Sequence, residues 1–213
     1  MRSATLTHGI GCSLRVVSTI CQREIDWLWI DCEHGWAASV EGTGAACVLA
    51  RSRGVAPVIR VAWNDPALIK KALDIGAVGV MVPQVRGHAH RLGQNASGTM
   101  VPHAVYHYVQ VQNAAEAKAA VDAARYYPEG MRGISPPWTA LAGMGMDNAV
   151  LKQIQEETVV MVQLESEESY NNLHEIAAVP GVRTLMTAST PTMFSLRYFA
   201  NGYVGRCHHG RAA

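Results

Sequence analysis

The sequence has no long hydrophobic run and almost no excess of charge of either sign. No apolar stretch approaches the roughly 18 residues that a membrane-spanning helix needs, and residues 1–13 lack the charged-then-apolar layout of a signal peptide. A net charge of +1 also argues against the strongly basic surface that is typical of nucleic-acid binding. We therefore expect a cytoplasmic protein whose partners include neither a membrane nor a nucleic acid.

Cysteines are few and irregularly placed. The five cysteines form no CxxC pair or other metal-binding spacing, and their odd number argues against a disulfide framework. With 49% hydrophobic and 16% charged residues among 213, the chain is neither disordered nor membrane-embedded, and it is long enough to bury a sizeable core. These properties favour one soluble α/β domain with reduced thiols.

Strand signals alternate with helix signals along the chain, as they do in parallel β/α folds. Runs of β-branched and aromatic residues predict strands at 25–30, 57–61, 79–83 and 159–165. Alanine-rich or apolar-periodic stretches predict helices at 40–53, 66–74, 114–126 and 169–178. The helix at 66–74 has a favourable start, because Asn64 or Asp65 can serve as its N-cap and Pro66 lies in its first turn.

The first of these strands ends in a group of polar residues, Asp31, Glu33 and His34. In α/β barrels, residues just past the carboxyl end of a strand face the active site. A carboxylate beside an imidazole fixes its tautomer and raises its basicity, so Asp31 and His34 are candidates for proton transfer near neutral pH. A surface turn with ordinary solvated charges explains this segment equally well when it is taken alone.

Four segments of the chain closely resemble the HpcH/HpaI aldolase family, the class II, metal-dependent aldolases of 2-oxo acids. In chain order they are DWLWIDCEHG, APVIRVAWNDPALIKKALDIGAVGVMVPQV, AAEAKAAVDAARYYPEGMRG and VVMVQLESEESYNNLHEIAAVPGV. The resemblance implies a TIM-type (β/α)8 barrel, usually oligomeric, and a reversible aldol cleavage that yields pyruvate or a related 2-oxo acid. It also implies a divalent metal, commonly Mg, Mn or Co, which holds the oxo acid.

The resemblance implies roles for particular residues. Glu165 matches a metal-binding carboxylate, and Gln163 matches a residue that contacts the substrate. Arg60 matches the arginine that binds the oxo and carboxylate oxygens of the substrate and stabilises the enolate, and Asp31 with His34 matches the acid–base pair. Each has a plainer alternative: Arg60 could form a surface salt bridge with Asp65, and Glu165 could simply end a strand at the surface.

The chain also departs from the family pattern. The family places a second metal carboxylate, an aspartate, at the end of the next strand, but this chain has no Asp or Glu after Glu175. Similarity is expected to end at Val182, leaving residues 183–213 as a divergent tail without an aldolase-like strand or helix. Of the family's first strand, only residues 9–12 are expected to remain. His208 and His209 are expected to belong to a disordered basic tail rather than to a metal site.

Residues 85–110 interrupt what is a continuous strand-to-helix passage in the family. Such a long structureless loop is uncommon inside a compact domain. The segment is either a genuine surface loop or a translated, unspliced intron. We therefore expect residues 1–182 to form one aldolase-like barrel domain with an atypical insertion at 85–110, incomplete at its C-terminal side.

The resulting hypothesis is a carbon–carbon lyase that releases pyruvate or a related 2-oxo acid through a metal-bound enolate. Its expected partners are a small-molecule 2-oxo acid, an aldehyde and further copies of itself in a homo-oligomer. One alternative is a decarboxylase or cycloaddition enzyme that resembles macrophomate synthase. The other is a non-catalytic pseudoenzyme or a truncated gene product, because a hard cation held by one protein carboxylate and waters should bind weakly.

Overall fold

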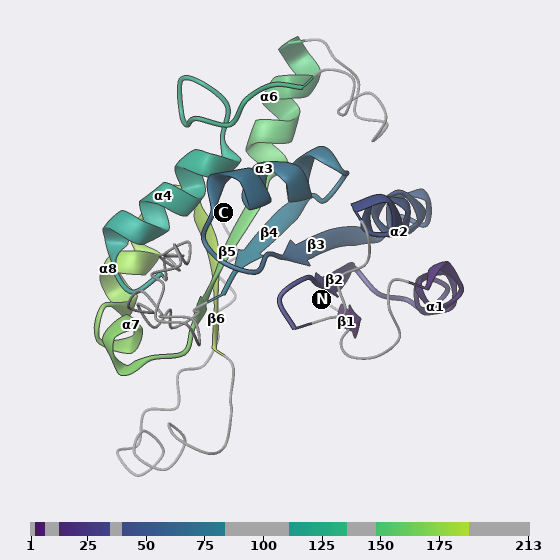
Figure 1. The fold of residues 1–213 in the computed structure, drawn as a ribbon, viewed down its shortest axis with the longest axis horizontal. Helices are drawn as coiled ribbons and strands as arrows, with labels where there is room; N and C mark the ends of the chain where they lie inside the picture. Colours follow the sequence, from purple (N-terminus) through teal and green to yellow (C-terminus); the bar gives the residue numbers. More distant parts are fainter. Residues whose placement is uncertain (1–2, 7–12, 35–39, 84–110, 136–147, 188–213) are drawn as a thin grey trace, which may run out of the picture.

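The computed structural model of the protein describes residues 3–6, 13–34, 40–83, 111–135 and 148–187 (Figure 1). These residues build a single parallel sheet whose six strands follow one another in chain order. The strands are β1 (Ser3–Leu6), β2 (Trp27–Asp31), β3 (Ala56–Arg60), β4 (Gly79–Val82), β5 (Val159–Leu164) and β6 (Val182–Thr187). Because every adjacent pair is parallel, the carboxyl ends of all six strands lie on the same side of the sheet, at the ends of the strands.

Helices connect the strands and cover one face of the sheet. They are α1 (Leu14–Ile20), α2 (Val40–Ser52), α3 (Pro66–Asp74), α4 (Ala114–Ala124), α6 (Asn148–Glu157), α7 (Glu167–Asn171) and α8 (Leu173–Ala177). Helices α3 and α4 lie side by side, and α1 packs against α2 (Figure 1). Asp65 caps α3 by accepting hydrogen bonds from the N–H groups of Ala67 and Leu68, with Pro66 in the first turn.

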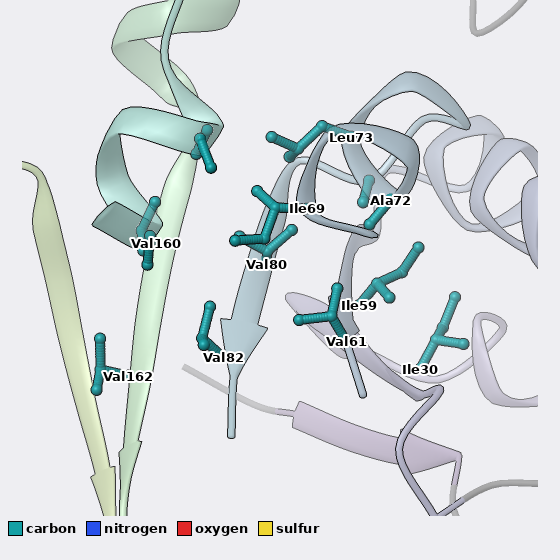
Figure 2. Close-up of a cluster of buried hydrophobic side chains, with 14 of the residues drawn as sticks. Ile30, Ile59, Val61, Ile69, Ala72, Leu73, Val80, Val82, Val160 and Val162 are labelled. Carbon is teal, nitrogen blue, oxygen red and sulfur yellow. The ribbon is translucent and has the colours of Figure 1, made fainter. Parts of the chain in front are cut away.

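The main hydrophobic core lies between this sheet and its helices. Alternation along the strands divides the side chains between two faces of the sheet. Apolar side chains of β3, β4 and β5 point toward the helices, where α3 meets them with Ile69, Ala72 and Leu73 (Figure 2). The residues in between, among them Arg60 and Gln163, point to the opposite, inner face.

The fold confirms the expected α/β class, and the predicted strands and helices agree with the structure at most positions. Two predictions about the ends of the sheet are wrong. A strand is present at Ser3–Leu6, whereas residues 9–12 lie outside the described residues. The sheet also continues beyond residue 182, because β6 runs to Thr187 and pairs with β5. The insertion at 85–110 and the tail after Thr187 lie outside the described residues as well.

A buried ion pair fastens the end of α3 to the segment that follows α4. The Arg132 Nη2 atom lies 2.8 Å from the Asp74 Oδ1 atom, and only 1% of the Arg132 side chain is exposed. The guanidinium also lies over the Tyr126 ring, 4.6 Å from its centroid. Removing one partner of a buried pair leaves the other charge without compensation, which is far more costly than losing an exposed pair.

We therefore expect Asp74→Ala to lower the free energy of unfolding by about 3 kcal/mol, measured by urea denaturation. The matched control is Lys118→Ala, which breaks the exposed pair with Asp122 within α4 and should cost less than about 0.5 kcal/mol. Equal losses in the two variants would contradict the structural role of the Asp74–Arg132 pair.

Candidate functional site

The candidate site lies on the inner face of the sheet, at the carboxyl ends of β2, β3 and β5. Asp31 is the last residue of β2 and is directly paired in register with Arg60, the last residue of β3. Gln163 is the next-to-last residue of β5, and Glu165 follows that strand. The parallel topology therefore brings together residues that are far apart in the sequence.

Arg60 is held by Asp31 in a two-pronged hydrogen-bonded ion pair. The Arg60 Nε atom donates to Asp31 Oδ1 over 2.8 Å, and Nη2 donates to Asp31 Oδ2 over 2.5 Å. The Asp31 side chain is fully buried and that of Arg60 is 7% exposed. Burial raises the pKa of Asp31, but hydrogen bonds from Arg60 and from the backbone N–H groups of Glu33 and His34 outweigh it and lower the pKa below its ordinary value.

The third corner of the guanidinium points toward the other polar groups. Arg60 Nη1 lies 2.9 Å from Glu33 Oε2, although this contact lacks the alignment of a hydrogen bond. Arg60 Nη1 also donates to Gln163 Oε1 over 3.5 Å. The Gln163 amide in turn donates from Nε2 to Glu165 Oε1 over 2.5 Å. One continuous polar chain thus runs from β2 through β3 to the end of β5.

Two carboxyl groups of the site, those of Glu33 and Glu165, have a pKa above the ordinary value for glutamate. Burial raises the pKa of Glu33 to about 7, since the attraction of Arg60 is offset by the negative charges of Glu165 and Asp31. Burial also raises the pKa of Glu165, against the hydrogen bond from Gln163 and the positive charge of Arg60. The cluster therefore holds more potential negative charge than its single guanidinium compensates.

His34 takes a different position from the one expected. Its side chain is 61% exposed, and its Nε2 atom lies 3.6 Å from Glu33 Oε1. Its backbone N–H, not its imidazole, donates to Asp31. The structure thus places Arg60 on the Asp31 carboxylate and Glu33 next to the imidazole, whereas the acid–base role of Asp31 and His34 stays a prediction.

Sequence reasoning assigned no role to Glu33, although a signal was present. Glu33 stands two positions after Asp31, and continued alternation past the strand end favours the same face. The plainer alternatives proposed for Arg60 and Glu165 are also wrong. Arg60 pairs with Asp31 while Asp65 caps α3, and Glu165 is half-buried rather than at the surface.

The described part of the chain contains no group of three or more His, Cys, Asp or Glu side chains placed to hold a metal ion. The chemistry of the site nevertheless suits a hard divalent cation. Its donors are carboxylate and amide oxygens, and three carboxyl groups, those of Asp31, Glu33 and Glu165, lie around a single guanidinium. His208 and His209 lie outside the described residues. The oxygen donors of the site therefore fit a hard divalent cation. Glu165 is the one carboxylate that the sequence resemblance assigns to such an ion.

A buried arginine and several carboxyl groups at the carboxyl ends of parallel strands form the kind of polar cluster that is found at active sites of β/α enzymes. The comparisons with known proteins agree with this class. The chain belongs to the HpcH/HpaI aldolase/citrate lyase family, whose sequence pattern it matches at residues 11–93 and 89–201. The two matches meet inside the interrupted segment 85–110. The second continues past Val182, where we had expected the similarity to end.

Curated relatives carry aldolase names. The chain is 34% identical over 162 residues to a 2-dehydro-3,6-dideoxy-6-sulfogluconate aldolase of Pseudomonas putida, covering 75% of this chain and 52% of the relative. It is 33% identical over 179 residues to a 4-hydroxy-2-oxo-heptane-1,7-dioate aldolase of Klebsiella pneumoniae, covering 80% and 54%. The chain thus spans about half the length of the curated relatives that it matches.

Solved structures support the barrel-type fold. An HpcH/HpaI aldolase from Desulfitobacterium hafniense has a TM-score of 0.69 and 22% identity, covering 87% of this chain and 61% of its own. A family protein from Burkholderia cenocepacia also has a TM-score of 0.69, with 24% identity and coverage of 98% and 70%. Macrophomate synthase is similar at a TM-score of 0.62 and 21% identity, covering 88% and 55%. The described sheet therefore corresponds to part of a TIM-type barrel.

Among the described residues, no helix has the length and apolar character needed to cross a bilayer.

The pKa of Glu33 makes the stability of the fold depend on pH. Between its ordinary pKa of 4.5 and about 7, the folded state keeps a proton that the unfolded state has released, so the free energy of unfolding falls as the pH rises. Glu33→Gln carries no such charge. We expect the variant to match the wild type near pH 4.5 and to exceed its free energy of unfolding by as much as about 3 kcal/mol at pH 8, since one pKa unit corresponds to about 1.4 kcal/mol.

Urea denaturation across this pH range, in buffer with a chelator to exclude divalent ions, measures the difference. Glu168→Gln is the matched control, because it removes a carboxylate exposed on α7 and outside the cluster. Parallel pH profiles for wild type and Glu33→Gln would show that Glu33 ionises in the folded state as it does in the unfolded chain.

Proposed function

We propose that the chain carries the anion-binding half-site of a carbon–carbon lyase that cleaves a hydroxy-2-oxo acid into pyruvate, or a related 2-oxo acid, and an aldehyde. The observation that carries the proposal is the Arg60 clamp. Asp31 occupies two corners of the guanidinium, and the third is directed at the polar inner face of the sheet. A planar cation fixed in this way suits the coplanar oxo and carboxylate oxygens of a 2-oxo acid.

Arg60 would bind the substrate and also stabilise charge that develops during the reaction. When the carbon–carbon bond breaks, its electron pair moves onto the oxo acid and forms an enolate whose oxygen becomes negative. A guanidinium that is already oriented and largely removed from water stabilises this charge without reorganisation. Gln163 supports the same placement, because its amide joins Arg60 Nη1 to Glu165.

His34 is the proposed acid–base group. Its imidazole is exposed at the rim of the site, where it can accept the proton of the substrate hydroxyl as the carbon–carbon bond breaks and the aldehyde leaves. A proton then returns to the enolate carbon and completes the 2-oxo acid. Glu33 lies beside both the imidazole and Arg60, so it is the group placed to orient the His34 ring.

Glu165 is the residue proposed to hold a divalent metal such as Mg, Mn or Co. When bound, such an ion supplies Lewis-acid polarisation of the oxo group. The oxygen donors and excess negative charge of the cluster support this proposal, but the chain has no acidic residue after Glu175 to complete the family's metal pair. That absence favours one competing function, a non-catalytic member of the family.

Calorimetric titration with Mn²⁺ and pyruvate separates the two functions. We expect pyruvate to bind only in the presence of the metal, and Glu165→Ala to abolish this binding. Arg60→Lys should weaken it about tenfold to a hundredfold, because a charge-assisted hydrogen bond contributes about 1.5–3 kcal/mol. Glu168→Ala, which removes an exposed carboxylate outside the cluster, is the matched control and should bind as the wild type does.

A wild-type sample that unfolds cooperatively but binds neither Mn²⁺ nor pyruvate would overturn the lyase proposal and support the non-catalytic alternative. Cleavage assays with short hydroxy-2-oxo acids then follow only for a protein that binds.

A further inference from the structure

Arg60 has a second neighbour besides its acidic partner. The guanidinium carbon lies over the ring of Trp29, 4.8 Å from the ring centroid. Trp29 stands two residues before Asp31 on β2, so both side chains project from the same face of the sheet. A largely buried arginine over an indole is the most favourable form of the cation–π contact, because little water competes for the charge.

The indole nitrogen of Trp29 makes no use of its hydrogen-bonding capacity. The Nε1 atom is buried and has no hydrogen-bond partner among the residues that the structure describes. A buried donor without an acceptor is unfavourable, and a ring without an N–H group would avoid this cost. The favourable contribution of Trp29 at this position therefore comes from the face of its ring.

The contacts of Asp31 and Trp29 restrict different motions of the guanidinium. The two hydrogen bonds that Arg60 donates to Asp31 act in the plane of the guanidinium and fix its position within that plane. They leave the plane free to tilt about the line that joins the two carboxylate oxygens. A ring against the flat side of the guanidinium opposes this tilt.

We infer that Trp29 is a positioning residue for Arg60, and that its ring face aims the Nη1 corner at the ligand position beside Glu33 and Gln163. Trp29 acts through Arg60 and is not itself a catalytic residue. The inference concerns the orientation of Arg60 in the free protein. Only its effect on ligand binding rests on the proposed function.

Nitrogen-15 relaxation of the arginine side-chain Nε–H groups tests the inference without any ligand. The Arg60 signal is identified by its loss in Arg60→Lys. We expect this signal to be rigid in the wild type and in Trp29→Phe, which keeps a ring face, and mobile on the subnanosecond timescale in Trp29→Leu. If Trp29→Leu does not fold, Trp29→Met takes its place with the same expectation, because it fills more of the volume and also lacks a ring.

Trp27→Leu is the matched control, since Trp27 is the same residue type on the same strand face, and the described structure places no cation over its ring. It should leave Arg60 rigid. An Arg60 signal that stays rigid in Trp29→Leu would overturn the inference, because the polar contacts of Arg60 with Asp31, Glu33 and Gln163 would then suffice. Equal mobility in Trp29→Phe and Trp29→Leu would overturn it too.

Pyruvate titration in the presence of Mn²⁺ gives the functional readout. Trp29→Leu should bind about tenfold more weakly, whereas Trp29→Phe and Trp27→Leu should stay within about twofold of the wild type. Unchanged binding in Trp29→Leu would show that the orientation of Arg60 does not matter for the ligand. Absence of binding in the wild type would count against the proposed function, and the relaxation data would still decide the role of Trp29.

Discussion

The ion pair between Asp31 and Arg60 is the interaction on which the candidate site depends. It joins the last residues of two neighbouring strands and removes both side chains almost completely from water. A buried guanidinium without its carboxylate would be strongly unfavourable, so the two residues stabilise one another's burial. The pair also links the other polar residues of the site. Glu33 and Gln163 meet the remaining corner of Arg60, and Glu165 is reached through Gln163.

The charge balance around this pair explains the properties of the other carboxyl groups. Asp31 accepts two aligned hydrogen bonds from Arg60, the single cation of the cluster, and these lower its pKa. Glu33 receives only an unaligned contact from the guanidinium, and Glu165 accepts a hydrogen bond from Gln163. For both of them the effect of burial dominates and the pKa rises. Contact with the same arginine and burial thus act in opposite directions on three nearby carboxyl groups, and they lower the pKa of one and raise the pKa of the other two. A ligand or ion that brings positive charge would reverse the second half of this arrangement.

Much of the fold could be predicted from local signals. The helix Pro66–Asp74 is correct at both ends, because an N-cap, a first-turn proline and an apolar periodicity all indicate the same limits. Strand β6 was missed, since its exposed Arg183 and Thr184 weaken the apolar pattern and its pairing with β5 is a tertiary effect. For the site, Arg60, Gln163 and Glu165 were named through the family resemblance, and the structure places them together. The partner of Asp31 could not be predicted, because residues next to one another in sequence suggested His34, whereas the strand register presents Arg60.

All the strands that contribute to the site are interior strands of the described sheet. Strands β2, β3 and β5 each have a hydrogen-bonded neighbour on both sides, while β1 and β6 form its edges. The strands that carry Asp31, Arg60 and Gln163 are therefore paired on both sides within the sheet. Insertions or sequence changes in the edge strands and connecting loops can alter the surroundings of the cluster while the Asp31–Arg60 pair is retained. The pair can therefore persist in proteins whose sheet margins have diverged.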